Sequence, residues 1–285
     1  MNKIENTFFE GERPLYGVQD VQLENVKFYP GESALKETRN IEARRCEFMG
    51  KYPFWHTDGA LIEESLFTVY GRAAIWYSKH ITMRDTRVEA PKIFRELDGV
   101  TLENVKLTCA EETLWNCRDI VLRNVEASKG DYLLMNGRNV EVENLRLQGN
   151  YTFQDVKNAV VRNSVLNSKD AFWHTENVTV YDSVLNGEYL GWYSKNLRLV
   201  NCRISGTQPL CYVENLIMEN CMMDESADLA FEYTTLNAEI NGSVTSIKNP
   251  SEGSIRVGSV GELILDENCR NRGACEIILE DEAAA

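Results

Sequence analysis

The sequence predicts an all-β fold, a single-stranded right-handed parallel β-helix of about 11–13 coils with about 19–21 residues each. Three observations support this. A short motif recurs at nearly constant spacing, apolar residues alternate within each copy, and asparagine, aspartate or glycine residues separate the alternating segments. Such a repeat is stronger evidence for the fold than any local pattern, because each copy is one structural unit that stacks on the next.

The first strand of each coil is defined by apolar residues at the second and fourth positions of the motif. DVQLENVKF starts at Asp20, and GVTLENVKL starts at Gly99. Alternation with a period of two is typical of a strand that buries one face. The copies begin at Asp20, Asn40, Gly59, His80, Gly99, Asp119, Asn139, Asn158, Asn177, Asn196 and Asn215.

A bend is expected at the sixth position, where the alternation breaks. Asparagine and aspartate tolerate the left-handed backbone conformation that turns a chain sharply, and stacked copies would form an Asn ladder at one turn. A second short strand, a glycine-rich bend and a third strand such as residues 52–55 then complete the coil. The bend residues are Asn25, Asp85, Asn104, Asn124, Asn144, Asn163, Asp182, Asn201 and Asn220.

The regular motif does not extend over the whole chain. We expect one domain, in which residues 1–17 form an N-terminal cap or first irregular coil and residues 18–236 form the regular coils. Residues 237–285, where the period decays, are expected to form irregular C-terminal coils. Stacked coils would lie about 4.8 Å apart, the usual spacing of hydrogen-bonded strands.

Several segments resemble known proteins. The asparagines at the bend resemble the asparagine ladder of the pectate-lyase and pectin-lyase superfamily. The segments SALKETRN, EAPKIFRELDGVTLENV, ETLWNC, KGDYLLMN, AFWHTENVTVYDS and GEYLGWYSKNL resemble an uncharacterised family of bacterial β-helix proteins, a domain of unknown function. The resemblance covers nearly the whole chain and implies the β-helix fold. It implies no activity, because that family has none assigned.

Composition and charge exclude several classes of partner. Lys and Arg total 30 and Asp and Glu total 44, for a net charge of −14, so we expect neither nucleic acid nor an anionic membrane surface as a partner. The start of the chain lacks a signal pattern, which favours the cytoplasm. The eight cysteines form no Cys-x-x-Cys pair and there are three histidines, so no metal and no cofactor are expected.

All five tryptophans fall in one column, four residues before successive motif starts. The same column holds Lys36, Arg95 and Gln154, whereas the preceding column is apolar throughout. Because neighbouring residues of a strand point to opposite faces, we expect the tryptophans outside. A terminal tail or a long turn would be one way to cover them. The expected substrate-binding residues are Trp55, Trp76, Trp115, Trp173 and Trp192, together with Tyr132.

Charged residues lie near the middle of this column. Lys92, Arg95, Glu112 and Asp131 are the candidate catalytic residues, and Arg95 is expected between Trp76 and Trp115 in adjacent coils. The polygalacturonase pattern of Asn-Thr-Asp, Asp-Asp, Gly-His-Gly and Arg-Ile-Lys is absent.

Three hypotheses about function fit the sequence. The first is a carbohydrate-binding or carbohydrate-active protein, lyase-like or hydrolase-like, that holds an oligosaccharide in a tryptophan-lined groove. The second is a non-catalytic binding module that uses the same groove. The third is a structural or assembly protein, a homo-oligomer whose tryptophan face is a subunit interface. The sequence leaves open whether the protein is an enzyme.

Overall fold

The chain folds as a parallel β-solenoid of about 15 turns, and residues 1–279, which the computed structural model describes, contain no helix. They form two compact units, residues 1–149 and residues 150–279. The expected all-β parallel β-helix is confirmed. The expected number of 11–13 coils is too low, because turns also form at both ends of the chain, where the motif is weak or absent.

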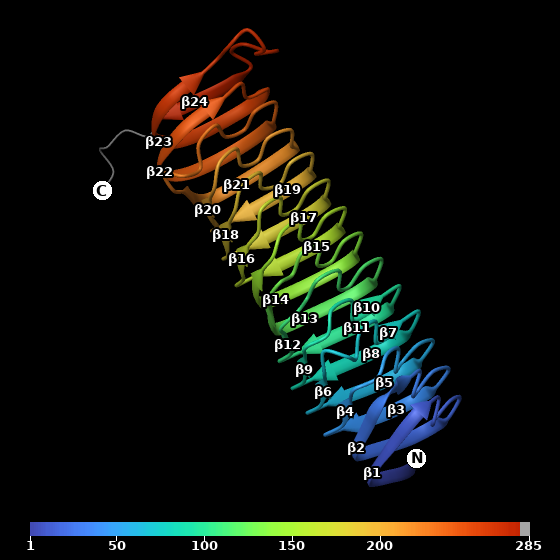
Figure 1. Cartoon of the computed structure of the whole chain (residues 1–285). Helices are drawn as coiled ribbons and strands as arrows, with labels where there is room; N and C mark the ends of the chain where they lie inside the picture. Colours follow the sequence, from blue (N-terminus) through green and yellow to red (C-terminus); the bar gives the residue numbers. More distant parts are fainter. Residues whose placement is uncertain (280–285) are drawn as a thin grey trace. The chain divides into compact units, whose positions relative to one another are not determined.

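The first unit contains fourteen strands, and those of successive turns lie side by side (Figure 1). The strands are β1 (Asn2–Glu12), β2 (Gln19–Glu32), β3 (Arg39–Arg44), β4 (Glu47–Phe48), β5 (Asp58–Glu63), β6 (Leu66–Phe67), β7 (Ile75–Trp76), β8 (Lys79–Arg84), β9 (Arg87–Val88), β10 (Phe94–Arg95), β11 (Asp98–Glu103), β12 (Lys106–Leu107), β13 (Arg118–Ala127) and β14 (Arg138–Gln148).

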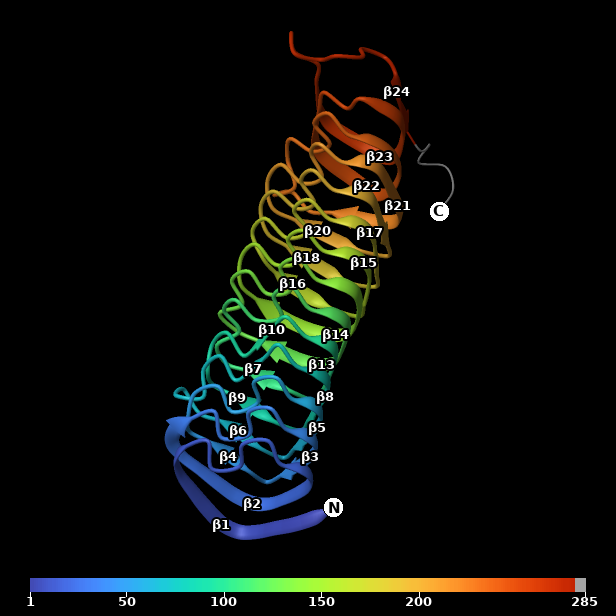
Figure 2. The same cartoon turned by 90° about the vertical axis from the view of Figure 1, so that its right-hand side faces the viewer.

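Within its described residues, the second unit contains ten strands, whose stacking is visible in Figure 2. They are β15 (Lys157–Arg162), β16 (Val165–Asn167), β17 (Glu176–Tyr181), β18 (Val184–Asn186), β19 (Lys195–Val200), β20 (Arg203–Ser205), β21 (Glu214–Met223), β22 (Thr235–Lys248), β23 (Glu252–Ile264) and β24 (Cys275–Leu279).

The terminal segments take part in the stacking. In residues 1–17, expected to be a cap or irregular coil, β1 pairs in parallel with β2 from Asn2 opposite Val21 onward, with a bulge between Phe9 and Gly11. In the region expected to be irregular, β22 pairs with β23 through a register shift between Ile240 and Ser243. Residues 280–285 of that expected region lie outside the described residues.

The core is built from columns of side chains at equivalent positions in successive turns. Phe28, Phe48 and Phe67 stack with ring centroids 5.2 and 4.6 Å apart and interplanar angles of 7° and 21°. All three are buried, and burying such a side chain contributes about 1.5–3 kcal/mol. In the second unit, Phe153 and Phe172 also lie in register, with centroids 4.8 Å apart and rings tilted by 35°. In-register stacking therefore builds the core in both units.

Asparagine residues form the corners, as the sequence predicts. Asn104 and Asn124 have φ angles of 54° and 53°, in the left-handed region, and the Asn124 amide donates to Asn104 Oδ1 at 3.0 Å. In the second unit Asn196 donates to Asn177 Oδ1 at 2.8 Å. Those two lie at the first position of the motif, which is also left-handed. They nevertheless belong to the strands β17 and β19, as the motif predicts.

The segment expected to be a third strand is mostly a tight turn. In residues 52–55 the chain bends, with φ angles of 58° at Tyr52 and 56° at His56. Among the described residues, only β7 and β10 are short strands at this position of the turn. The turns still stack through backbone hydrogen bonds, because the N–H groups of Phe54 and His56 donate to the carbonyls of Ala74 and Trp76 at 2.9 and 3.1 Å. Side chains in the turn nevertheless alternate between inside and outside.

An alternating column of acidic and basic residues lines the outer face of the first unit. Its members are Glu24, Arg44, Glu63, Arg84, Glu103 and Arg123, each opposite the next in register. Arg84 Nε lies 2.7 Å from Glu103 Oε2, and Arg123 Nη1 lies 3.0 Å from Glu103 Oε1. Opposite charges thus face each other at each step, whereas like charges in register would destabilise the pairing.

The first prediction concerns acid stability. The hydrogen bond from Arg84, with a second from Arg123, holds the pKa of Glu103 below its ordinary value of 4.5. Because the folded-state pKa is the lower one, Glu103 stabilises the fold above about pH 4.5, and this contribution disappears as pH falls through the folded-state pKa. Arg84→Gln should lower Tm at neutral pH by at most a few degrees and flatten the fall of Tm in acid.

Thermal unfolding followed by circular dichroism between about pH 6 and about pH 3 measures this effect. Arg203→Gln, which changes an exposed arginine of β20, is the matched control and should keep the wild-type pH profile. A profile for Arg84→Gln as steep as that of the wild type would contradict the role of the charge column.

Candidate functional site

The tryptophans of the first unit lie on the outer side of the turns. Trp55, Trp76 and Trp115 are half-buried. The residues directly before them, such as Phe54 and Ile75, are completely buried. The indoles thus pack against the outside of the solenoid wall.

These indoles stack on one another and on cations along the column. The Trp55 and Trp76 rings are nearly parallel, 10° apart, with centroids separated by 5.4 Å. The Arg95 guanidinium lies between two indoles, its Cζ 4.5 Å from the centroid of Trp76 and 4.5 Å from that of Trp115. Lys36 Nζ lies 5.9 Å from the Trp55 ring. We call these five residues the cation–indole column.

The polar edges of the indoles are also satisfied inside the protein. Trp55 Nε1 donates to the carbonyl of Ala73 at 2.7 Å, and Trp76 Nε1 donates to that of Lys92 at 2.8 Å. Trp115 Nε1 donates to the carbonyl of Tyr132 at 2.6 Å. Each bond joins an indole to the following turn. Both faces of Trp76 are covered, one by Trp55 and the other by Arg95, and its N–H group is bonded, so this indole presents mainly its ring edge to solvent.

The candidate catalytic residues are brought together in part. Glu112 Oε2 lies 2.9 Å from Lys92 Nζ and 3.3 Å from Arg95 Nη2, so one carboxylate joins two cations. The exposed Asp131 lies one turn on, where its carbonyl accepts the Glu112 N–H at 2.9 Å. Tyr132 packs edge-on against Trp115, with centroids 6.3 Å apart. Lys92 and Glu112 thus hold the Arg95 side chain of the cation–indole column in place.

A second group of aromatic residues covers part of the second unit. Trp173 and Trp192 have centroids 5.7 Å apart, and Trp192 Nε1 donates to the Gln208 carbonyl at 2.7 Å. Tyr193 stacks on Tyr212 at 4.7 Å and remains 45% exposed. We call the whole group the aromatic surface. Its members are Trp173, His174, Tyr189, Trp192, Tyr193, Tyr212 and Tyr233.

The two tryptophans of this surface were predicted as site residues from the sequence, but none of its four tyrosines was. Their sequence position could have indicated two further aromatic members, because His174 and Tyr193 directly follow Trp173 and Trp192. These following residues occupy left-handed corners, with φ angles of 54° and 58°. A corner residue projects outward beside the column, and this places its ring next to the indole.

The cysteines act as packing residues. All eight are free, and burial raises the pKa of the Cys46 thiol to about 11 and that of the Cys117 thiol to about 12. Such thiols stay protonated at neutral pH and are poor nucleophiles and poor metal ligands. No group of three or more His, Cys, Asp or Glu residues in the described part of the chain could hold a metal ion.

With the geometry established, comparison with known proteins assigns a family. Residues 2–278 match the family described as protein of unknown function DUF3737. The chain belongs to this family. The expected membership of a family of unknown function is therefore confirmed, whereas a place in the pectin-lyase superfamily stays a prediction. No curated protein matches the chain.

Three solved structures are similar in fold at low identity. The surface adhesin PfbA of Streptococcus pneumoniae is 10% identical, with 83% of this chain and 82% of that chain covered and a TM-score of 0.47. The plasmid-mediated fluoroquinolone resistance protein QnrB1 is 14% identical over 70% and 93% of the two chains, with a TM-score of 0.37. The A-module of mannuronan C-5 epimerase AlgE6 from Azotobacter vinelandii is 12% identical over 98% and 81%, with a TM-score of 0.27.

Nothing in the described residues could cross a bilayer as a helix.

The second prediction tests the cation–indole column. Arg95→Gln removes the cation between Trp76 and Trp115, and should reduce the free energy of unfolding by about 1–2 kcal/mol. The exposed indole faces should shift the tryptophan emission to longer wavelength. Chemical unfolding and the native emission spectrum measure the two effects.

Arg118→Gln is the matched control, because Arg118 pairs with Asp98 at 2.6 Å and is 62% exposed. It should leave the emission spectrum unchanged. Equal spectra for Arg95→Gln and the wild type would show that the guanidinium does not cover the indoles.

Proposed function

We propose that the protein is a non-catalytic assembly protein, and that the aromatic surface of residues 150–279 is its interface with a second copy of the chain. The observation that supports this most is the number of aromatic rings gathered on this surface, where Tyr193 stacks on Tyr212 and remains 45% exposed. The Trp192 N–H group is already bonded to the Gln208 carbonyl, so a partner would meet mainly aromatic ring surface here. Tryptophan and tyrosine are enriched at protein interfaces, where they contribute much of the binding energy.

The alternative hypotheses of a carbohydrate-binding module or a carbohydrate-active enzyme have less support. A sugar ring stacks on the open face of an aromatic ring, but Trp76 has one face against Trp55 and the other against Arg95. The candidate acid Glu112 joins two cations in an ion-pair cluster. Both arrangements fit residues that hold successive turns together.

The proposal also includes features of fold and location. Right-handed winding is the usual hand of parallel crossovers, and the asparagine hydrogen bonds between turns fit an Asn ladder like that of the pectin-lyase superfamily. Free, buried thiols fit the reducing cytoplasm. We place the protein there on this basis.

The third prediction is a dependence of oligomeric state on the aromatic surface. The wild-type chain of 32.5 kDa should have the mass of a dimer, and higher salt should favour the dimer because each copy carries a net charge of −14. Tyr193→Ser should raise the dissociation constant about tenfold or more, since a tyrosine that is an interface hot spot contributes about 2 kcal/mol or more. Light scattering after size exclusion, over a range of concentrations, measures the mass.

Tyr29→Ser is the matched control, because Tyr29 is 38% exposed and belongs to β2 rather than to the aromatic surface. It should dimerise like the wild type. A wild-type chain that stays monomeric at all concentrations would refute the proposal. If that monomer also bound oligosaccharide, the carbohydrate hypothesis would replace it.

A further inference from the structure

An open pocket of about 610 Å³ lies across three successive turns of the first unit. Pockets that bind small molecules typically measure about 300–1,000 Å³ and combine apolar walls with a few polar groups. This pocket lies at the ends of β2, β4 and β6, and the cation–indole column does not line it. The cation–indole column therefore does not account for this pocket.

A local insertion forms one wall of the pocket. The motif starts Gly59 and His80 are 21 residues apart, whereas Asn40 and Gly59 are 19 apart. The extra residues form a tight turn, closed by a 2.9 Å hydrogen bond from Gly71 N to the Thr68 carbonyl. This turn carries Val69 and Tyr70, which are 55% and 67% exposed. Large apolar side chains exposed together on one turn are unusual unless they contact a ligand or a partner.

Two glycines in the preceding turns form the floor of the pocket, where no side chain fills the space. A Cβ at Gly50 would lie 2.5 Å from the carbonyl oxygen of Gly31, and a Cβ at Gly31 would lie 2.1 Å from that of Gly11. The backbone stacking therefore admits no side chain at these two positions. The insertion adds bulk one turn after Gly50 and two turns after Gly31, and this difference in bulk forms the recess.

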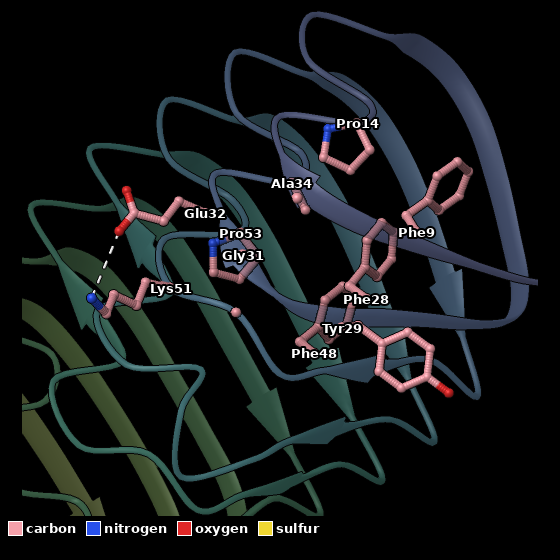
Figure 3. Close-up of a pocket in the computed structure, with 12 residues that line it drawn as sticks. Phe9, Pro14, Phe28, Tyr29, Gly31, Glu32, Ala34, Phe48, Lys51 and Pro53 are labelled. Carbon is pink, nitrogen blue, oxygen red and sulfur yellow. Dashed lines mark ion pairs between the residues drawn. The ribbon is translucent and has the colours of Figure 1, made fainter.

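A smaller cavity adjoins this floor (Figure 3). It measures about 10 Å³, space for about one water molecule, and lies against the buried rings of Phe28 and Phe48. A ligand would therefore occupy the open pocket and not the core behind it.

Two cations line the open pocket. Lys51 Nζ lies 3.6 Å from Glu32 Oε1, a long ion pair that Figure 3 marks with a dashed line. Arg72 is exposed, and no hydrogen bond or ion pair engages its guanidinium among residues 1–279. Val69 and Tyr70 line the same pocket, so this guanidinium lies beside apolar side chains. Guanidinium groups pair well with planar anions such as carboxylates.

We propose that this pocket binds a small aromatic carboxylate. Its ring would lie between Tyr70 and the glycine floor, and its carboxylate would face Arg72 and Lys51. The proposal is independent of the assembly function, because the pocket and the aromatic surface share no residue. No covalent step is involved.

The fourth prediction tests this site with 2-naphthoate as the probe, titrated into the full chain by isothermal calorimetry. The wild type should bind one equivalent, and the neutral analogue 2-naphthalenemethanol should bind at least about tenfold more weakly, since a charge-assisted hydrogen bond contributes about 1.5–3 kcal/mol. Arg72→Gln should weaken 2-naphthoate binding by a similar factor without changing binding of the neutral analogue. Tyr70→Ser should weaken binding of both.

Arg87→Gln is the matched control, because Arg87 is exposed on β9 and lies outside the pocket. It should bind 2-naphthoate like the wild type, and unchanged circular dichroism spectra should show that all variants fold. Absence of saturable binding would overturn the proposal. So would equal affinity for the acid and the alcohol, or wild-type affinity in both Arg72→Gln and Tyr70→Ser.

Discussion

The hydrogen-bonded stacking of each turn on the equivalent residues of the next is the constraint on which the remaining structure depends. Parallel pairs such as Ile41 with Ala60 set the register, and each side chain then meets the side chain 19–21 positions further along. A favourable contact at one position therefore recurs up the column. Phenylalanines stack inside, asparagines bond at the corners, and opposite charges alternate on the outer face. Each of these columns opposes a slip of register, because a slip would disrupt them all together.

The same constraint explains the tryptophans. Stacked positions lie about 4.8 Å apart, close to the distance at which an indole and a guanidinium plane make contact. Arg95 therefore fills the position between Trp76 and Trp115, and the three indole N–H groups of the cation–indole column donate to carbonyls on the following turn. In the structure these contacts link successive turns along the outer wall. The aromatic surface of residues 150–279 keeps more of its tyrosine rings accessible.

The repeat period was sufficient to predict whether a side chain points into the core or outward. It placed Phe54 inside and Trp55 outside, and it placed left-handed corners at residues such as Asn104. It could not distinguish strand from tight turn at residues 52–55, because both alternate side chains. Nor could it show that both faces of Trp76 are covered, since ring orientation depends on side-chain packing. The pocket beside Tyr70 depends on the conformation of a short insertion, which no repeat pattern specifies.

A double-mutant cycle between Trp76→Ala and Arg95→Gln, measured by chemical unfolding, tests the central claim most directly. These residues are 19 positions apart in the sequence and in contact only if the turns stack in register. The account predicts a favourable coupling of about 1 kcal/mol, whereas the pair Trp76→Ala and Arg118→Gln should be additive within about 0.5 kcal/mol. Additivity of Trp76→Ala and Arg95→Gln would contradict it.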